Sequence, residues 1–270
     1  MSKNILVTGM SGLIGGIAGR HLAKKYNVRA LNRRDVPGFE TVRGDISDLA
    51  SIQPAFDGVD TVVHMAAYLG PDNERHLAVN ATGTYNVFEA ARQAGVKRVV
   101  FGSSGAVQAA VEKDEPIRAM TEARMDDVPT PRPLVTHESP IRPSNMYGAV
   151  KLFGEALGKA YSESHGMSVL CIRLGRVRQG NRPENSREAS VYLSHRDAAQ
   201  MVEKCVDAAD SVRFGIFYAV SDNFSRFRDI EHAREVIGYV PQDGIPAWPL
   251  PDGWEPSTTP IVVGDSTSES

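Results

Sequence analysis

The 270-residue chain is poor in cysteine, in long apolar runs and in net charge, and each shortage excludes a class of protein. Its two cysteines, Cys171 and Cys205, supply neither a disulfide framework nor a metal-binding set, and both stand in apolar stretches that predict buried thiols. No apolar run approaches the roughly 20 residues that a membrane-spanning helix needs. A formal net charge of -3 argues against broad electrostatic binding to nucleic acid or anionic membranes.

The N-terminus and the histidines also lack the patterns of other protein classes. The chain passes from Met1 through three polar residues into a short apolar stretch, without the long apolar segment and cleavage site of a signal peptide. The seven histidines do not pair with carboxylates at metal-site spacing. With an ordinary globular composition, these features predict a cytoplasmic enzyme that binds neither a metal, a membrane nor nucleic acid.

Short apolar stretches alternate with amphipathic ones over the first two thirds of the chain. Branched apolar residues predict strands at 5–7, 28–31, 60–64, 98–101 and 169–173. Helical spacing predicts helices at 13–25, 80–94 and 147–165, and one after 42–45 with Ser47 as its N-cap. This alternation predicts the α/β class, as a Rossmann-type doubly wound parallel sheet.

Two segments break the alternation and suggest a domain organisation. Residues 1–174 are expected to form a dinucleotide-binding Rossmann domain, interrupted at about 111–143 by a proline- and charge-rich loop or lid. Residues 175–262 are expected to form a small substrate-binding lobe, with a helix at 197–208 and a strand at 215–220. The polar residues 263–270 predict a disordered tail.

Three glycines, Gly9, Gly12 and Gly15, stand between the first predicted strand and the first predicted helix. The first allows a tight turn, the second lets backbone approach a pyrophosphate, and the third lets the helix pack closely on the strand. The helix N-terminus then offers free N–H groups and its positive dipole end to phosphates. We therefore predict a dinucleotide site at this loop, contacted by the neighbouring residues Ser11, Leu13 and Ile14.

The end of the second predicted strand bears on the choice of cofactor. An acidic residue at this position favours the ribose 2′-hydroxyl of NAD, whereas basic residues suit the 2′-phosphate of NADP. The chain has Asn32 there, followed by Arg33 and Arg34, whose guanidinium groups match phosphate geometry. These residues favour NADP, while Asp35 keeps NAD open if the strand runs further.

Tyr147 and Lys151 are four residues apart and therefore project from one face of the predicted helix. A phenol with its ordinary pKa of about 10 is a poor base at neutral pH. A nearby ammonium and an oxidised nicotinamide both favour the phenolate and lower that pKa. Ser104, at the carboxyl end of a predicted strand, is placed to orient a substrate oxygen. The three residues predict proton transfer beside a bound nicotinamide.

The chain resembles the extended short-chain dehydrogenase/reductases, the NAD-dependent epimerase/dehydratase family, over nearly its whole length. The matching stretches are the glycine loop at Gly9, Asp45-Ile46, His64 to Ala67, Asn80 to Thr84, Ser103-Ser104 and Tyr147 to Lys151. By this resemblance Ser104, Tyr147 and Lys151 form the catalytic triad. The resemblance also implies further cofactor contacts from Asp45, Ile46, Met65, Ala66, Ala67 and Asn80. Members of this superfamily often dimerise through two helices, here 80–94 and 147–165, which implies a homodimer.

Within this family the chain is most similar to uronate dehydrogenases and related aldose dehydrogenases. The stretches that carry this likeness are 153–158, 192–197 and 218–223, and the short C-terminal region also fits. Arg187 matches the arginine that grips the substrate carboxylate in uronate dehydrogenases. Gly105 and Ala106 follow the catalytic serine where those enzymes have Asn-His, which removes two polar contacts next to the substrate.

The resemblance implies oxidation of a sugar or uronate at its C1 hydroxyl, giving a lactone, with Ser104, Gly105, Tyr147 and Arg187 contacting the substrate. Two alternatives stay open. One is an epimerase or dehydratase that keeps its NAD and acts on a nucleotide sugar, although the C-terminal region is short for this. The other is a non-catalytic sensor of NADP(H), which has no chemical need for all three triad residues.

Overall fold

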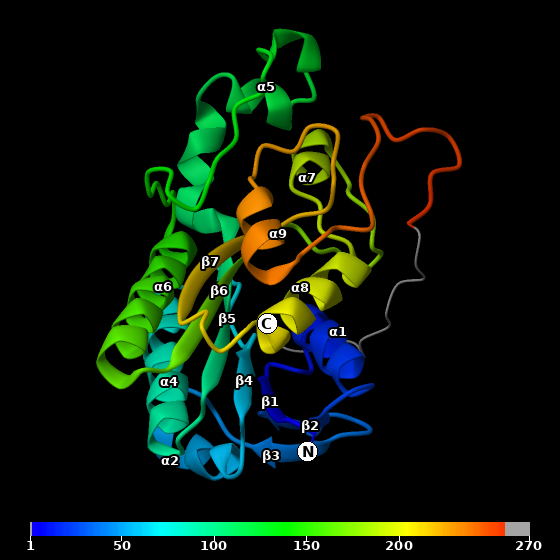
Figure 1. Cartoon of the computed structure of the whole chain (residues 1–270). Coiled ribbons are helices and arrows are strands. Elements are labelled where there is room, and N and C mark those ends of the chain that lie inside the picture. Colours follow the sequence, from blue (N-terminus) through cyan, green and yellow to red (C-terminus); the bar gives the residue numbers. More distant parts are fainter. Residues whose placement is uncertain (1, 257–270) are drawn as a thin grey trace.

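The structure is a computed structural model that describes residues 2–256 of the chain (Figure 1). Residue 1 and residues 257–270, which include the tail predicted at 263–270, lie outside the described residues. Among residues 2–256, the helices are too short or too polar to cross a bilayer.

One parallel sheet forms the centre of the molecule, with seven strands in the described part of the chain. Its order is β3-β2-β1-β4-β5-β6-β7. The strands are β1 Asn4–Thr8, β2 Asn27–Asn32, β3 Glu40–Arg43, β4 Thr61–His64, β5 Arg98–Ser104, β6 Ser168–Leu174 and β7 Phe214–Ala219. The chain builds outward from β1 to β3, returns, and builds from β4 to β7 on the other side. The carboxyl ends of β1 and β4 therefore flank the point where a doubly wound sheet opens a ligand crevice.

Helices cover both faces of the sheet (Figure 1). The elements α1 and α8 lie over one face, and α2, α4 and α6 over the other. The α-helices are α1 Leu13–Leu22, α2 Leu49–Ile52, α3 Asn73–Arg75, α4 Gly83–Gln93, α5 Ile117–Thr121, α6 Met146–His165, α7 Ser186–Ser190, α8 His195–Asp207 and α9 Glu231–Ile237. Shorter turns are the 3-10 segments Gln53–Phe56, Gly105–Lys113 and Met125–Asp127 and the π-helix His76–Thr82. The predicted Rossmann-type fold is confirmed.

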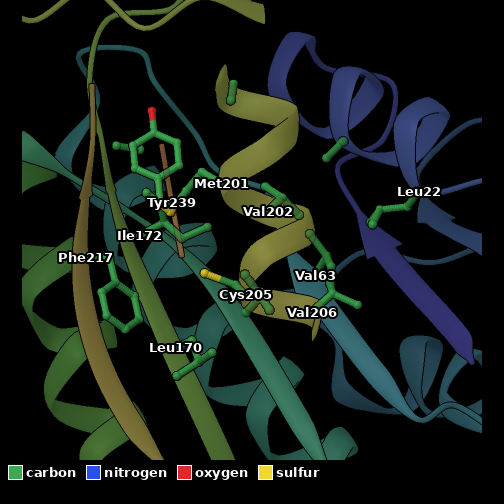
Figure 2. Packing of buried hydrophobic residues seen from close by; sticks show 14 of the residues in the cluster. Leu22, Val63, Leu170, Ile172, Met201, Val202, Cys205, Val206, Phe217 and Tyr239 are labelled. Carbon is green, nitrogen blue, oxygen red and sulfur yellow. The ribbon is translucent and has the colours of Figure 1, made fainter. Parts of the chain in front are cut away.

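The sheet separates two apolar cores. On one side, α8 packs Met201, Val202 and Cys205 against Leu170 and neighbouring side chains of the sheet (Figure 2). On the other side, side chains of α4 and α6 pack with alternate residues of the same strands. Cys171 and Cys205 are buried free thiols in the two different cores, as the sequence predicts. Because the central strands are covered on both faces, their sequences are continuous apolar runs rather than alternating apolar and polar residues.

Several predicted boundaries differ from the structure. The N-cap of α2 is Asp48, whose carboxylate accepts from the N–H groups of Ala50 and Ser51; Ser47 instead bonds to Asp45 in the preceding turn. The helix predicted at 80–94 begins earlier, as the π-helix His76–Thr82 that runs into α4. Local hydrogen-bonding choices of this kind are not visible in apolar spacing.

The C-terminal segment does not form one separate lobe. Its helix α8 and strand β7 complete the central sheet and its cover, because β7 pairs in parallel with β6. Of the remainder, α9 packs into the first core, and Tyr192 and Ile245 form a separate small cluster. Two further residues join the 111–143 insertion in a third apolar cluster above the strand ends. That cluster unites Ile117, Met120 and Val135 with Val191 and Phe227. We call the insertion together with 175–194 and 220–256 the roof. Its assignment to substrate binding stays a prediction.

Candidate active site

A cavity of about 1060 Å³ lies at the carboxyl ends of the strands, between the sheet and the roof. It runs from the glycine loop, past the end of β5, to side chains of the roof. Most of the predicted site residues line it. They are Gly9, Ser11, Gly12, Leu13, Ile14, Gly15, Asn32, Arg33, Asp45, Ile46, Met65, Ala66, Ala67, Ser104, Gly105, Tyr147, Lys151 and Arg187. Arg34 and Asn80 lie outside its lining.

The glycine loop has the close contacts that the sequence predicts. Gly9 has a φ of +69°, and a Cβ there would lie 2.6 Å from the backbone of Ala66. A Cβ on Gly15 would lie 2.3 Å from the carbonyl oxygen of Gly9. Gly12 is the N-cap of α1, and no side chain caps the first N–H groups of this helix. The loop therefore leaves a backbone cradle and a positive helix end facing the cavity.

The ends of β2 and β3 form one end of the cavity. Asn32 is buried, and its side-chain oxygen accepts from the backbone N–H of Ser11 at 3.4 Å. Arg33 reaches the cavity wall beside Asp45. Partial burial works against ionisation of Asp45, but hydrogen bonds from Ser47 and the charge of Arg33 hold its pKa below the ordinary value. Asp35 is turned away, because Arg43 binds its carboxylate.

Two buried polar residues, His64 of β4 and Asn80 of the π-helix before α4, support the cavity wall. His64 is fully buried between Thr8 and Thr84, at 2.7 and 3.2 Å, and burial with the nearby charge of Lys151 lowers its pKa to about 3. Asn80 is buried and holds the backbone of Tyr68 by two hydrogen bonds, of 2.7 and 2.8 Å. In the structure Asn80 thus supports the wall formed by Tyr68, and its predicted cofactor contact stays a prediction.

Helix α6 carries Tyr147 in its first turn. Asn145 starts the helix, since its side-chain oxygen accepts from the backbone N–H of Gly148 at 2.9 Å. Gly148 lets the helix approach the 3-10 segment after β5 closely, because a Cβ there would lie 2.5 Å from the carbonyl oxygen of Ala106. The Tyr147 phenol consequently reaches the Ser104 hydroxyl. Burial raises the pKa of Tyr147, and the hydrogen bond with Ser104 works in the opposite direction.

Lys151 lies one turn further along α6 and is buried beneath the tyrosine. Its ammonium donates to the carbonyl oxygen of Gly102 at 2.7 Å and stands 5.7 Å from the centre of the Tyr147 ring. Burial lowers its pKa to about 8. The three residues of the predicted triad therefore meet at the middle of the cavity, brought together by β5 and α6.

A buried ion pair stands behind the triad. Arg173 of β6 binds Glu155 of α6 through two hydrogen bonds of 2.9 Å, and both side chains are almost completely buried. The hydroxyl of Ser103, next to Ser104, donates to the same carboxylate at 2.6 Å. Breaking one partner of such a pair leaves an uncompensated charge inside the protein. The pair thus ties the ends of β5 and β6 to the helix that carries Tyr147 and Lys151.

The roof end of the cavity contains charged residues that sequence reasoning missed. Glu112 and Arg228 line the cavity together with the predicted substrate residue Arg187. Arg187 donates to the Glu112 carboxylate through Nε at 2.6 Å and a terminal nitrogen at 3.1 Å. These residues are far apart in sequence and belong to no motif, so only the packing of the roof brings them together.

The site fits a dinucleotide and offers no metal centre among the described residues. The uncapped N-terminus of α1 at Gly12 and the volume of the cavity suit a pyrophosphate flanked by two nucleosides. Within residues 2–256, no group of three or more histidines, cysteines and carboxylates could hold a metal ion.

Comparison with known proteins identifies the family. The model of the NAD dependent epimerase/dehydratase family matches residues 5–206. The chain belongs to this family. The resemblance inferred from the sequence motifs is thereby confirmed, and the matched region covers every strand of the sheet except β7.

Several of its relatives are sugar dehydrogenases. The chain is 32% identical to an NAD-dependent glucose-6-phosphate dehydrogenase of Haloferax volcanii, covering 90% of this chain and 94% of that protein. It is 33% identical to an L-arabinose 1-dehydrogenase (NAD(P)(+)) of the same organism, covering 88% and 96%. A mutant of uronate dehydrogenase from Agrobacterium tumefaciens, complexed with NAD, superposes with a TM-score of 0.74 at 25% identity, covering 90% of this chain and 85% of that one.

Proposed function

We propose that the protein is an NAD(P)-dependent dehydrogenase that oxidises the C1 hydroxyl of a sugar to a lactone. The observation that carries this proposal is the meeting of Ser104, Tyr147 and Lys151 midway along the cavity that starts at the glycine loop. The sugar dehydrogenases among its relatives support the substrate class. A nicotinamide dinucleotide, when bound, supplies the acceptor for the hydride that leaves C1.

The residues of the chain supply proton transfer and orientation. The Tyr147 phenolate takes the proton of the C1 hydroxyl, while the Ser104 hydroxyl orients the same oxygen. Lys151, held by the carbonyl oxygen of Gly102, places its charge below the phenol and favours the phenolate. Glu155 and Arg173 fix the strand ends on which this geometry depends. The backbone N–H groups at Gly12 and the start of α1 would hold the pyrophosphate.

We further propose NADP as the preferred cofactor. Arg33 lines the cavity where the adenosine ribose would lie, and its fork suits a 2′-phosphate. Asn32 removes the negative charge that would repel that phosphate. Asp35, the residue that left NAD open, is engaged by Arg43 and lies outside the cavity lining.

We also propose a homodimer formed through α4 and α6. These helices pack side by side over one face of the sheet (Figure 1). Their outer surfaces expose large apolar side chains, with Tyr85 on α4 44% exposed and Phe153 on α6 43% exposed. Leu77, just before α4, is 51% exposed. A second copy of the same surface would remove these side chains from water.

The test is a panel of aldoses, uronates, sugar phosphates and simple alcohols, each assayed with NAD and with NADP. Reduced nicotinamide is followed by absorbance and the sugar product by mass spectrometry. We expect a cyclic sugar to be oxidised to its lactone. The Tyr147→Phe variant should bind the cofactor normally and lose activity by about 10²–10⁴-fold. Equal activity of this variant and the wild type on the best sugar would rule out the proposed mechanism.

A further inference from the structure

The roof end of the cavity carries a carboxylate whose position bears on the choice of sugar. Glu112 stands at the end of the 3-10 segment Gly105–Lys113, which starts directly after Ser104. Its side chain is only 13% exposed and faces the same cavity as the triad. Among the described residues that line the cavity, the other carboxylate is Asp45, at the opposite end.

Two arginines hold the Glu112 carboxylate in place. Arg187 binds it bidentately, at 2.6 and 3.1 Å, and is itself 53% exposed. A terminal nitrogen of Arg228 lies 3.7 Å from the same carboxylate. Arg228 is almost fully buried and anchored, because it donates to the Tyr218 hydroxyl at 3.0 Å and to the carbonyl oxygen of Gly105 at 3.2 Å. If Arg187 swung out into solvent together with Glu112, the Glu112 carboxylate would lose its contact with the buried Arg228. Arg228 therefore keeps Glu112 in the cavity.

This arrangement affects neutral and anionic sugars differently. A neutral sugar leaves the Arg187–Glu112 pair intact and can donate a hydroxyl hydrogen to the carboxylate, which only accepts. A carboxylate on the sugar would have to compete with Glu112 for the Nε edge of Arg187. The charge of Glu112 is offset by Arg228, and Lys113 and Arg176 also line the cavity, so the discrimination comes from the occupied guanidinium of Arg187 rather than from long-range repulsion.

We propose that Glu112 is a specificity-determining residue that makes the pocket select a neutral aldose over the corresponding uronate. It does so by occupying Arg187, the residue that resemblance to uronate dehydrogenases assigns to the substrate carboxylate. This inference rests on the proposed sugar dehydrogenase function and narrows its substrate class.

The first experiment compares matched sugars on the wild-type enzyme. Glucose and glucuronate, and likewise galactose and galacturonate, share the ring and C1 and differ in charge at C6. We expect kcat/KM to be at least tenfold higher for the aldose of each pair. A preference for the uronate would overturn the assignment of Glu112 while leaving the dehydrogenase function intact. Turnover of no sugar at all would remove the proposed function, and this inference with it.

The second experiment removes the charge of Glu112. The Glu112→Gln variant should raise the ratio of uronate to aldose kcat/KM at least tenfold. Adding Arg187→Gln to this variant should abolish the gain, because the gain depends on the guanidinium that Glu112→Gln sets free.

Glu122→Gln is the matched control: it makes the same change in the same insertion, outside the cavity lining, and should leave the ratio within twofold. A folded, cofactor-binding Glu112→Gln enzyme with an unchanged ratio would overturn the proposal. If that variant does not fold, the ratio of aldose to uronate kcat/KM measured on the wild type still tests the proposal.

Discussion

Burial sets the properties of the individual side chains in the active site. Lys151 is enclosed by α6 and β5, so its pKa falls to about 8, and the pKa of Tyr147 rises for the same reason. The cofactor-free protein thus holds both groups closer to neutrality than they would be in water. A positive charge arriving at the nicotinamide position would shift Tyr147 toward the phenolate.

The lowered pKa of Lys151 has a consequence for stability. The unfolded chain keeps this lysine protonated up to a pH near its ordinary pKa of 10.5, whereas the folded chain releases the proton near 8. Burial of the ammonium therefore lowers the free energy of unfolding by its full amount below about pH 8. This destabilisation disappears as the pH rises toward 10.5. Lys151→Met should be more stable than the wild type at pH 7, by up to about 3 kcal/mol, and lose that advantage at alkaline pH.

Urea unfolding of both proteins at pH 7 and pH 10 measures this difference. Lys159→Met, which replaces an exposed lysine of the same helix, serves as the control and should change stability little at either pH. An advantage of Lys151→Met that stays constant across this range would contradict the burial of a charged lysine.

The two neighbouring arginines after β2 provide a matched pair for cofactor choice. Arg33 lines the cavity and Arg34 does not. Arg33→Ala should raise the KM for NADP about tenfold or more, since a hydrogen bond to a charged group contributes about 1.5–3 kcal/mol. The KM for NAD should change little, and Arg34→Ala should leave both values near the wild type. Steady-state kinetics with each cofactor decides, and a similar effect of both substitutions would count against a specific phosphate contact.

Single residues with a local signature could be predicted from the sequence, and those without one could not. Tyr147 and Lys151 carry their signature in their spacing, and Ser104 in its place at a strand end. Glu112 and Arg228 have no such signature, because they meet only after the roof has packed.

At the scale of elements, the turn between β1 and α1 is the most constrained part of the site. A methyl group on Gly15 would lie 2.3 Å from the carbonyl oxygen of Gly9, so the loop or the helix would have to move. Gly15→Ala should destabilise the protein by about 1–3 kcal/mol and weaken cofactor binding at least tenfold.

Calorimetric titration with the cofactor and thermal unfolding measure both effects. Gly180→Ala is the control, because no atom lies within 4 Å of a Cβ at that position. Wild-type affinity in Gly15→Ala would show that the loop does not form the cofactor cradle.

The strands and long helices could be predicted because apolar spacing reflects burial directly. The alternation of branched runs and helical stretches gave the doubly wound sheet. Ends of elements depend on single hydrogen bonds, and Asp48 rather than Ser47 caps α2 for that reason. The π-helix before α4 was also missed, since its apolar positions do not differ from those of an ordinary helix start.

At the scale of the whole molecule, the outer surfaces of α4 and α6 determine the expected assembly. The wild type should have twice the chain mass in solution. The double variant Tyr85→Asp with Phe153→Asp should be a folded monomer, because two carboxylates would be buried in the interface. Light scattering after size exclusion measures the mass. Val240→Asp, an exposed apolar position elsewhere, should remain dimeric. A monomeric wild type would refute the proposed assembly.

The division of the chain into domains was the least predictable feature at this scale. Weakened alternation after residue 174 suggested a separate lobe, yet β7 and α8 belong to the central sheet and its cover. The roof instead combines an insertion in the first half with two stretches of the second half. Such a union depends on long-range packing, which no local pattern encodes.

The third apolar cluster, which joins the insertion to Val191 and Phe227 of the roof, shares no residue with the two cores that flank the sheet. Changes that reshape the ceiling over a sugar can therefore accumulate without weakening the platform that carries the nucleotide and the proton-transfer groups. Substitutions in this cluster, natural or designed, could therefore change the sugar specificity while the residues that carry out the reaction stay the same.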